Sequence, residues 1–410
     1  MSMRTRPRYR AAVAIGATAV MVLAGCGALS AESAQQTVVV GVDLELTGAG
    51  EALGAIHRQA LELRVEQINQ QGLLGNRQIE LEIRDNRSNP ATSALNVGEL
   101  ADDPSVVAIV TGGCVLCVES STEVAEARQV PLVSLAAADP VGAVDDHRYT
   151  FKLGPNADHN AAALIGELNA AGVDTIGLAA AADAYGEAGV REVTDAAERA
   201  GIEVAITVRI ESEVDAEQLA GPAEQIATWQ PTPVDPPLFG EPPPPTGPDA
   251  VVVWLPAPQA GQFAQALRDS GYDGRLALDA LGAEELFLSG AVGAALDGAT
   301  LVFTEVLVMD TVLATSPAKA ARKSWFNTYS ARYGTYHAAS SFAADALQLV
   351  VEAISQIDST DREEIRNAME RTQMDGLSGR VRITPDNHSG LTAAALITLV
   401  ASSDRWQSAS

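Results

Sequence analysis

Short runs of β-branched and aliphatic residues alternate with amphipathic helical patterns along most of this chain. The first run covers 37–42, and 52–71 follows with Leu61, Val65 and Ile68 on one helical face. An apolar run without polar alternation is typical of a strand buried on both faces, as in a parallel sheet. Strands that alternate with helices form right-handed βαβ units, so we predict an α/β fold with parallel sheets.

The alternation restarts near residue 156, so the chain resembles one α/β layout made twice: two Rossmann-like lobes. We expect further strands at 78–84, 106–110, 130–135, 175–180, 203–210, 250–255, 276–278, 300–306, 380–383 and 391–400. We expect further helices at 120–128, 156–171, 185–200, 215–228, 258–270, 319–333 and 340–357. Asn89 before Pro90 favours another helix start, and Thr360 with Glu363 has the spacing of a capping box.

The first 25 residues have the pattern of an export signal. Four arginines precede an apolar run at 11–24, and no acid occurs there. The string Leu23-Ala24-Gly25-Cys26 resembles the bacterial lipobox, which implies cleavage before Cys26 and a lipid on its sulfur. An uncleaved anchor and an ordinary signal peptide remain alternatives. We interpret 26–36 as a polar tether.

The chain is strongly acidic, with 53 Asp and Glu against 27 Lys and Arg and a net charge of −26. Removal of residues 1–25 takes away four bases and leaves −30. Nucleic acid is excluded as a partner because phosphate binding needs a basic surface. Anionic lipid would repel such a domain, so membrane attachment would depend on the lipid anchor.

Gly48, Gly50 and Gly54 follow the first predicted strand. Their spacing is one residue longer than a dinucleotide fingerprint, and the next acid after a strand is Asp85, some 31 residues on. We therefore expect no cofactor and interpret the glycines as a turn that leads into a helix.

Cys114 and Cys117 form a C-x-x-C motif after the strand at 106–110. A structural disulfide and a redox dithiol are both compatible with it, and an extracytoplasmic location favours the disulfide. Zinc is not expected, because two thiolates do not fill a tetrahedral site and no histidine is near in sequence. The histidines show no metal spacing, no catalytic motif occurs, and we expect no enzyme: the five are His57, His147, His159, His337 and His388.

The segment 231–248 holds nine of the 20 prolines. Proline removes a backbone donor, so this segment is not a central strand. We interpret 230–248 as a loop insertion of polyproline II character, with a ligand for a proline-recognition domain as the alternative.

The mature chain resembles the type I periplasmic binding proteins, in particular the leucine/isoleucine/valine-binding branch of ABC importers. The resemblance lies in Val39-Val40-Gly41-Val42-Asp43-Leu44 with Thr47-Gly48, in 65–72, Arg84-Asp85-Asn86, Gly112-Gly113-Cys114 to Thr122, 130–134, Ala184-Tyr185-Gly186-Glu187 and 261–272. It implies two lobes joined by a three-strand hinge, with 37–155 and 306–384 in the N-lobe and 156–305 and 385–410 in the C-lobe. The crossings would fall at 154–156, 305–306 and 383–385, and a ligand would bind between the lobes at the strand ends.

The resemblance also implies ligand-binding positions, although several depart from the family. Ala138 occupies the position of a family threonine, and Pro256 that of a family tyrosine. Ala157 and Ala280 occupy positions that are acidic in the family, and each is adjacent in sequence to an aspartate, Asp158 and Asp279. For these aspartates and Asp139 the alternative is helix capping, and for Tyr185 a core aromatic. The implied positions are Leu53, Glu119, Ser120, Ser121, Thr122, Ala136, Ala138, Asp139, Asp158, Tyr185, Pro256 and Asp279.

We therefore expect a lipid-anchored substrate-binding protein that delivers a small polar solute, such as an amino acid, amide or amine, to ABC permease subunits. Acids at three candidate strand ends favour a cationic group on that solute. A sensory module for a membrane partner and an exported thiol-redox enzyme are the alternatives.

Overall fold

The computed structural model describes residues 36–136, 147–154, 156–211, 214–231, 247–257, 259–279, 288, 290–402 and 405–409. The predicted signal segment, Cys26, most of the proline-rich segment, Ala138, Asp139 and Ala280 lie outside these residues. Within them, no helix has the length and apolar character needed to cross a membrane.

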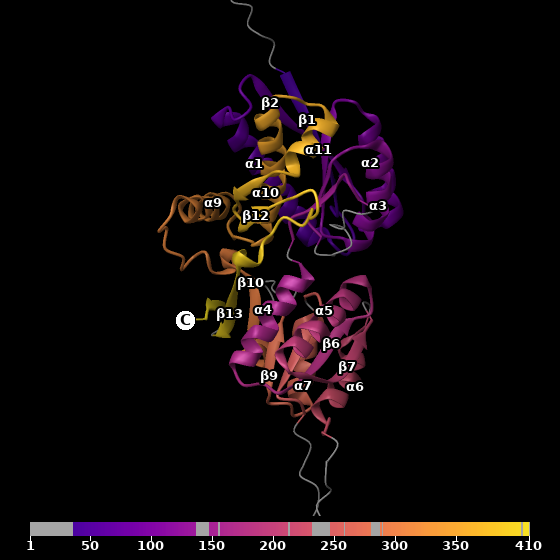
Figure 1. Cartoon of the computed structure of the whole chain (residues 1–410), viewed down its shortest axis with the longest axis vertical. Coiled ribbons are helices and arrows are strands. Elements are labelled where there is room, and N and C mark those ends of the chain that lie inside the picture. Colours follow the sequence, from indigo (N-terminus) through magenta and orange to yellow (C-terminus); the bar gives the residue numbers. More distant parts are fainter. Residues whose placement is uncertain are drawn as a thin grey trace, which may run out of the picture. The chain divides into compact units, whose positions relative to one another are not determined.

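Sheet A is a five-stranded parallel sheet in the order β2-β1-β3-β4-β5. Its strands are β1 (Gln36–Leu44), β2 (Arg77–Asp85), β3 (Val106–Thr111), β4 (Leu132–Ser134) and β5 (Thr150–Lys152). The helices that connect them are α1 (Glu51–Gln71), α2 (Pro90–Asp102) and α3 (Val115–Arg128). α2 and α3 pack against each other, while α1 packs with a helix from much later in the chain (Figure 1).

Sheet B has seven strands in the order β14-β13-β10-β9-β8-β6-β7. The parallel strands are β6 (Thr175–Ala181), β7 (Glu203–Ile210), β8 (Ala250–Trp254), β9 (Arg275–Leu278) and β10 (Thr300–Thr304). β13 (Leu396–Ser402) and β14 (Arg405–Ser408) join antiparallel at one edge. The helices are α4 (Ala157–Ala170), α5 (Ala184–Ala200), α6 (Ala216–Ala227), α7 (Gln259–Asp269) and α8 (Gly290–Leu296).

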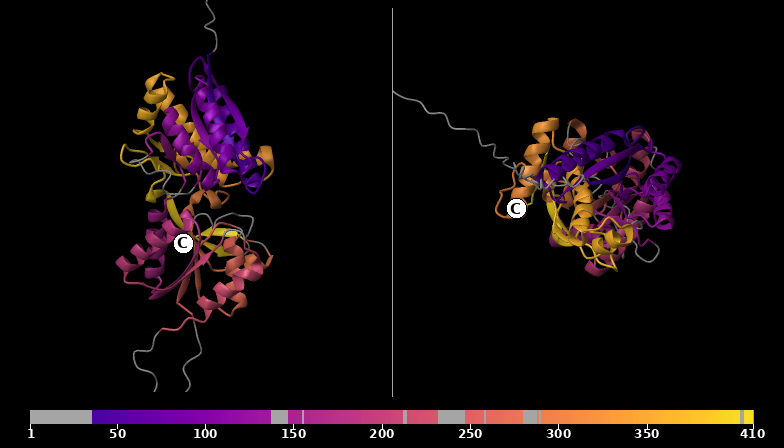
Figure 2. Two further views of the ribbon diagram at one scale, coloured as in Figure 1. Left: turned by 90° about the vertical axis from the view of Figure 1, so that its right-hand side faces the viewer. Right: turned by 90° about the horizontal axis from the view of Figure 1, so that it is seen from above.

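The chain returns to sheet A after β10. Its late helices, drawn in orange and gold, lie among the indigo and purple segments of sheet A (Figure 2). Val306 to Val308 still belong to the apolar core around sheet B. Met309 and Ile383 belong to the core around sheet A. Leu391 belongs to the core around sheet B again. The late elements are η4 (Glu305–Val308), α9 (Pro317–Tyr333), α10 (Ala339–Ile357), α11 (Arg362–Met369), β11 (Gln373–Asp375), β12 (Arg380–Arg382) and η5 (Ala393–Ala395).

The predicted α/β class is confirmed: sheet A is parallel as expected, whereas sheet B is mixed, because β13 and β14 join it antiparallel. Asn89 caps α2 as expected: its side chain accepts a hydrogen bond from the Thr92 amide, and Pro90 is the first helical residue. The capping box at Thr360 is wrong. Asp361 caps α11 instead, because its carboxylate accepts from the Glu364 amide.

Four strands and α-helices of the described residues were not expected from the sequence: β5, α8, β11 and β14. None is longer than seven residues, and such segments show too few periods of a pattern to be recognised. α3 also begins at Val115 rather than near 120, which changes where its side chains lie.

Tight packing in sheet B gives the first prediction. A Cβ on Gly189 of α5 would lie 2.4 Å from the indole of Trp254, so we expect Gly189→Ala to lower the free energy of unfolding by about 1–3 kcal/mol. Gly166 of α4 is the matched control, since a Cβ there would meet no atom of the described residues within 4 Å. We expect Gly166→Ala to raise stability by about 0.5–1 kcal/mol. Urea unfolding measures both, and equal effects of the two substitutions would contradict the packing described.

Candidate functional site

Each sheet has a central strand whose two neighbours are reached by connections that run to opposite sides of it. In sheet A, β1 lies between β2 and β3, and in sheet B, β6 lies between β7 and β8. Loops that follow neighbouring strands diverge at such a switch point, and the crevice between them is where open α/β sheets bind ligands. The candidate site is therefore built from the residues that follow β1, β3, β6, β8 and β9.

Glu45, directly after β1, occupies the switch point of sheet A. Its buried carboxylate accepts hydrogen bonds from the amides of Cys114, at 3.1 Å, and Gly113, at 3.3 Å. Two glycines make room for it: a Cβ on Gly112 would lie 2.1 Å from Oε2, and one on Gly54 would lie 2.1 Å from the Glu45 carbonyl oxygen. Gly54 is thus required for the close approach of α1.

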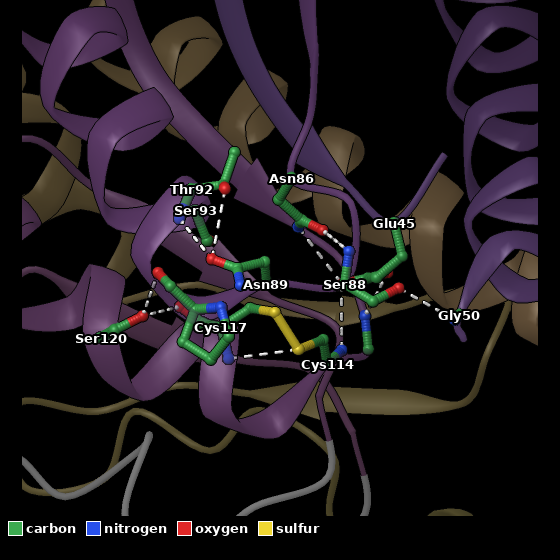
Figure 3. The surroundings of a disulfide bond; sticks show 12 residues. Glu45, Gly50, Asn86, Ser88, Asn89, Thr92, Ser93, Cys114, Cys117 and Ser120 are labelled. Atoms are coloured by element: carbon green, nitrogen blue, oxygen red, sulfur yellow. Dashed lines mark hydrogen bonds between the residues drawn. A yellow bond between two sulfur atoms is a disulfide. The ribbon is translucent and has the colours of Figure 1, made fainter. Parts of the chain in front are cut away.

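A disulfide joins Cys114 and Cys117 at the start of α3, beside Glu45 (Figure 3). Cys114 is the N-cap residue, and its Sγ accepts a hydrogen bond from the Cys117 amide at 3.2 Å. Cys117 is buried, whereas Cys114 is half-buried. The bond holds the first turn of α3 next to the Glu45 carboxylate.

A second buried acid lies on β1 itself. The Asp43 carboxylate accepts hydrogen bonds from Asn86 at 3.0 Å, from Asn96 at 2.7 Å and from the Ser93 hydroxyl. Burial raises the pKa of Asp43 and of Glu45, although these hydrogen bonds favour the charged forms. Acids whose ionised form is held at a cost in a crevice are typical of functional sites.

Aromatic side chains and an acid gather at the switch point of sheet B. The Tyr185 hydroxyl donates a hydrogen bond to the Asp279 carboxylate. The Tyr185 and Trp254 rings lie 5.9 Å apart, and Trp254 Nε1 is buried with no hydrogen-bond partner among the described residues. These three residues come from the ends of β6, β8 and β9, so the fold brings together Tyr185 and Asp279 as the strand-end rule predicts.

The other predicted residues of the first lobe fall into two groups. Leu53 lies at the switch point, because a Cβ on Gly113 would be 2.7 Å from its Cδ2. The hydroxyls of Ser120, Ser121 and Thr122 instead donate to carbonyl oxygens of α3 itself, and that of Ser120 also to Pro90. Glu119, on the same helix, is half-buried.

The remaining positions are more scattered. Ala136 is buried after β4, and Pro256 provides the carbonyl that accepts from the Ala260 amide at the start of α7. Asp158 is largely exposed in the first turn of α4, where it accepts from the His159 amide. Ala138 and Asp139 lie outside the described residues. The ligand-binding roles of all these positions stay predictions.

Three residues were missed by the sequence reasoning: Glu45, Trp254 and His57. Glu45 and Trp254 carry a detectable signal, since each is a polar or amphipathic residue at the end of an apolar strand. His57 is buried on α1, and a Cβ on Gly113 would lie 3.8 Å from its Cε1. Burial lowers the pKa of His57 to about 4, so the imidazole is neutral at pH 7.

The buried charge of Glu45 generates the second prediction. The pKa of Glu45 is higher in the folded chain than in the unfolded chain, where it is near 4.5, so protonated Glu45 favours folding. That contribution to stability is lost as the pH rises from 4.5 through the pKa of the folded chain. We expect the stability of Glu45→Gln relative to the wild type to increase over that rise, because the amide does not ionise. Urea unfolding from pH 4 to 8 measures it, with the exposed Glu198→Gln as control. Parallel pH profiles for Glu45→Gln and the wild type would contradict the burial argument.

Comparison with solved structures agrees with this architecture. An extracellular ligand-binding receptor from Rhodopseudomonas palustris HaA2 has a TM-score of 0.75 at 20% identity, over 91% of this chain and 99% of the other. A leucine-binding protein from Thermotoga maritima has a TM-score of 0.73 at 17% identity, over 91% and 98%. An ABC transporter substrate-binding protein from Desulfitobacterium hafniense, solved in complex with Leu, has a TM-score of 0.71 at 15% identity, over 91% and 100%.

The family is established by sequence. A search of curated proteins finds no match to the chain. The sequence profile of the periplasmic binding proteins, however, matches residues 37–404, which is most of the chain. This family consists of binding proteins rather than enzymes, as the lack of catalytic motifs led us to expect. The chain belongs to the periplasmic binding protein family.

Proposed function

We propose that this chain is the lipid-anchored, extracytoplasmic substrate-binding protein of an ABC importer and that it binds a small polar solute with a cationic group. The match of the binding-protein family over residues 37–404 carries this proposal. The structural relatives include a leucine-binding protein and a transporter component solved with Leu, which favours an amino acid or a related amine or amide.

The acids at the two switch points support the cationic group. Glu45 lies at the carboxyl ends of the strands of sheet A, Asp279 lies at those of sheet B, and both side chains are buried. A ligand ammonium placed near either carboxylate would gain a charge-assisted hydrogen bond in a poorly solvated crevice. Tyr185 and Trp254 add aromatic faces, which also favour a cation.

The same geometry disfavours an anionic group at one place. Backbone amides at a helix N-terminus are a general anion site, but those of Gly113 and Cys114 already donate to Glu45. A ligand carboxylate at the start of α3 would also meet the charge of Glu45 itself. Any carboxylate on the ligand must therefore be held elsewhere in the crevice.

The third prediction tests the ligand class. We expect isothermal titration calorimetry of the full mature chain to show binding within a panel of branched-chain and basic amino acids, their amides, and polyamines. Asp279→Asn should weaken that binding by about 10- to 100-fold, because a charge-assisted hydrogen bond contributes about 1.5–3 kcal/mol. Asp195→Asn, on the exposed face of α5, is the matched control and should bind as the wild type does.

Two outcomes would contradict the proposal. Binding of sugars or inorganic anions alone would overturn the ligand class, and equal affinities for Asp279→Asn and the wild type would remove Asp279 from the site. Ligand binding without any loss of solute uptake in a deletion strain would favour the sensory module over the importer.

The fourth prediction concerns the anchor. We expect the full chain, expressed in a bacterium, to partition into detergent with the membrane fraction, and Cys26→Ser to appear in the aqueous phase or retain its signal. A single lipid-modified cysteine at the new N-terminus, seen by mass spectrometry, is the direct measurement. Ser30→Ala in the tether is the control. Aqueous partition of both wild type and control would contradict the lipid anchor.

A further inference from the structure

The disulfide at the start of α3 lies within a set of potential metal ligands. One carboxylate oxygen of Glu45 and the Sγ atoms of Cys114 and Cys117 all lie within 4.8 Å of one another. We propose that, when a dithiol reductant opens this disulfide, Cys114, Cys117, Glu45 and His57 form a binding site for a zinc-like divalent cation. Glu45 is shared with the solute site proposed above, so the test below measures the two separately.

The separations are close to those of a coordinated ion. Two ligands at about 2.3 Å from a tetrahedral metal lie about 3.8 Å apart. The Glu45 oxygen must therefore approach the sulfurs by about 1 Å or less, while the two sulfurs move apart once their bond is broken. Cys114 is the N-cap of α3 and Cys117 lies in its first turn, so rotation about their own side-chain bonds lets the two sulfurs separate.

Electrostatics favour a cation once the thiols are free. The reduced site would place two sulfurs beside Glu45, with the buried acid Asp43 linked to it through Asn86, which donates to Asp43 at 3.0 Å and to Glu45 at 3.5 Å. Thiolates next to carboxylates repel one another in a poorly solvated place. A divalent cation removes that repulsion, and soft thiolate ligands select zinc-like ions over magnesium or calcium.

His57 approaches the loop of Cys114 from another element; its ring nitrogens are not among the atoms that lie within 4.8 Å of one another, so it must move toward the ion to become the fourth ligand. It is 3% exposed, and its Nδ1 has no hydrogen-bond partner among the described residues. Cε1, next to both ring nitrogens, faces Gly113 in the loop that carries Cys114. A histidine binds a metal through a ring nitrogen, and the buried Nδ1 is such a donor. This histidine was invisible to spacing arguments because it lies on α1.

The chemistry balances in two steps. A dithiol transfers two electrons and two protons to the Cys114–Cys117 bond and becomes a disulfide itself, which leaves two thiols on the protein. The divalent cation then displaces the two thiol protons as both sulfurs coordinate. A disulfide oxidant reverses the first step: it takes two electrons from the thiolates and two protons from solvent, becomes a dithiol, and leaves the Cys114–Cys117 bond re-formed and the ion released.

Cobalt(II) is the probe, because thiolate coordination gives it a charge-transfer absorption. The full mature chain is reduced with dithiothreitol, freed of it under nitrogen and titrated with Co²⁺, then with Zn²⁺ as competitor. We expect one ion per reduced chain with thiolate-to-cobalt absorption, and none for the oxidised chain. Cys114→Ser with Cys117→Ser should abolish binding, and Glu45→Gln and His57→Gln should each weaken it at least tenfold.

Controls and contrary outcomes are defined by the same titration. Glu123→Gln, on the exposed face of α3, and His337→Gln should bind as the wild type does. No absorption from the reduced wild type overturns the proposal, and wild-type affinity in Glu45→Gln or His57→Gln overturns the assignment of that ligand. Alkylation of the reduced thiols with iodoacetamide tests the site without substitution, and persistent binding after it also overturns the proposal. Solute calorimetry on the oxidised chain keeps this result separate from the proposed function.

Discussion

The contact between the Glu45 carboxylate and the amides of Gly113 and Cys114 joins two segments that are distant in sequence. It holds the loop after β3 against the end of β1, and it requires glycine at 112 and at 54, so the start of α1 is placed by the same residue. The disulfide and the N-cap of α3 follow directly from the position of that loop. The carboxyl edge of sheet A therefore takes its shape from one buried acid.

That acid is retained at a cost. Hydrogen bonds to a charged group each contribute about 1.5–3 kcal/mol, yet burial still raises the pKa of Glu45, so desolvation outweighs its two amide donors. A glutamine or a smaller side chain would avoid that cost. Sheet B repeats the arrangement with Asp279, which is 1% exposed and accepts from Tyr185. Both carboxylates are buried at the carboxyl edge of a sheet, where their desolvation disfavours the charged form.

The sequence predicts those parts of the fold that depend on local signals. Apolar runs identify the long strands, and caps such as Asn89 identify helix starts, because both effects act within a few residues. β5 has only three residues, and its pairing includes the amide of Lys152, which donates to the carbonyl of His388 from the far end of the chain. A pairing over that sequence distance leaves no local pattern.

The candidate site was harder to predict for the same reason. Leu53, Tyr185 and Asp279 follow from strand ends and lie at the switch points. Ser121 and Thr122 were expected near the start of a helix, but α3 begins at Val115, which places both hydroxyls in its second and third turns, where they donate to carbonyls of the same helix. Glu45 acquires its role only from amides 68 and 69 residues away.

The start of α3 shows how the sequence can set selectivity before any ligand arrives. The amides of Gly113 and Cys114 donate to Glu45, and that of Cys117 donates to the Cys114 sulfur. Three of the donors near this helix N-terminus are thus used by the protein's own groups rather than left for an anion. The Glu45 carboxylate then lies next to the two sulfurs of Cys114 and Cys117. A buried carboxylate favours a cation over an anion at this point, and a free thiolate is a better metal donor than a disulfide sulfur.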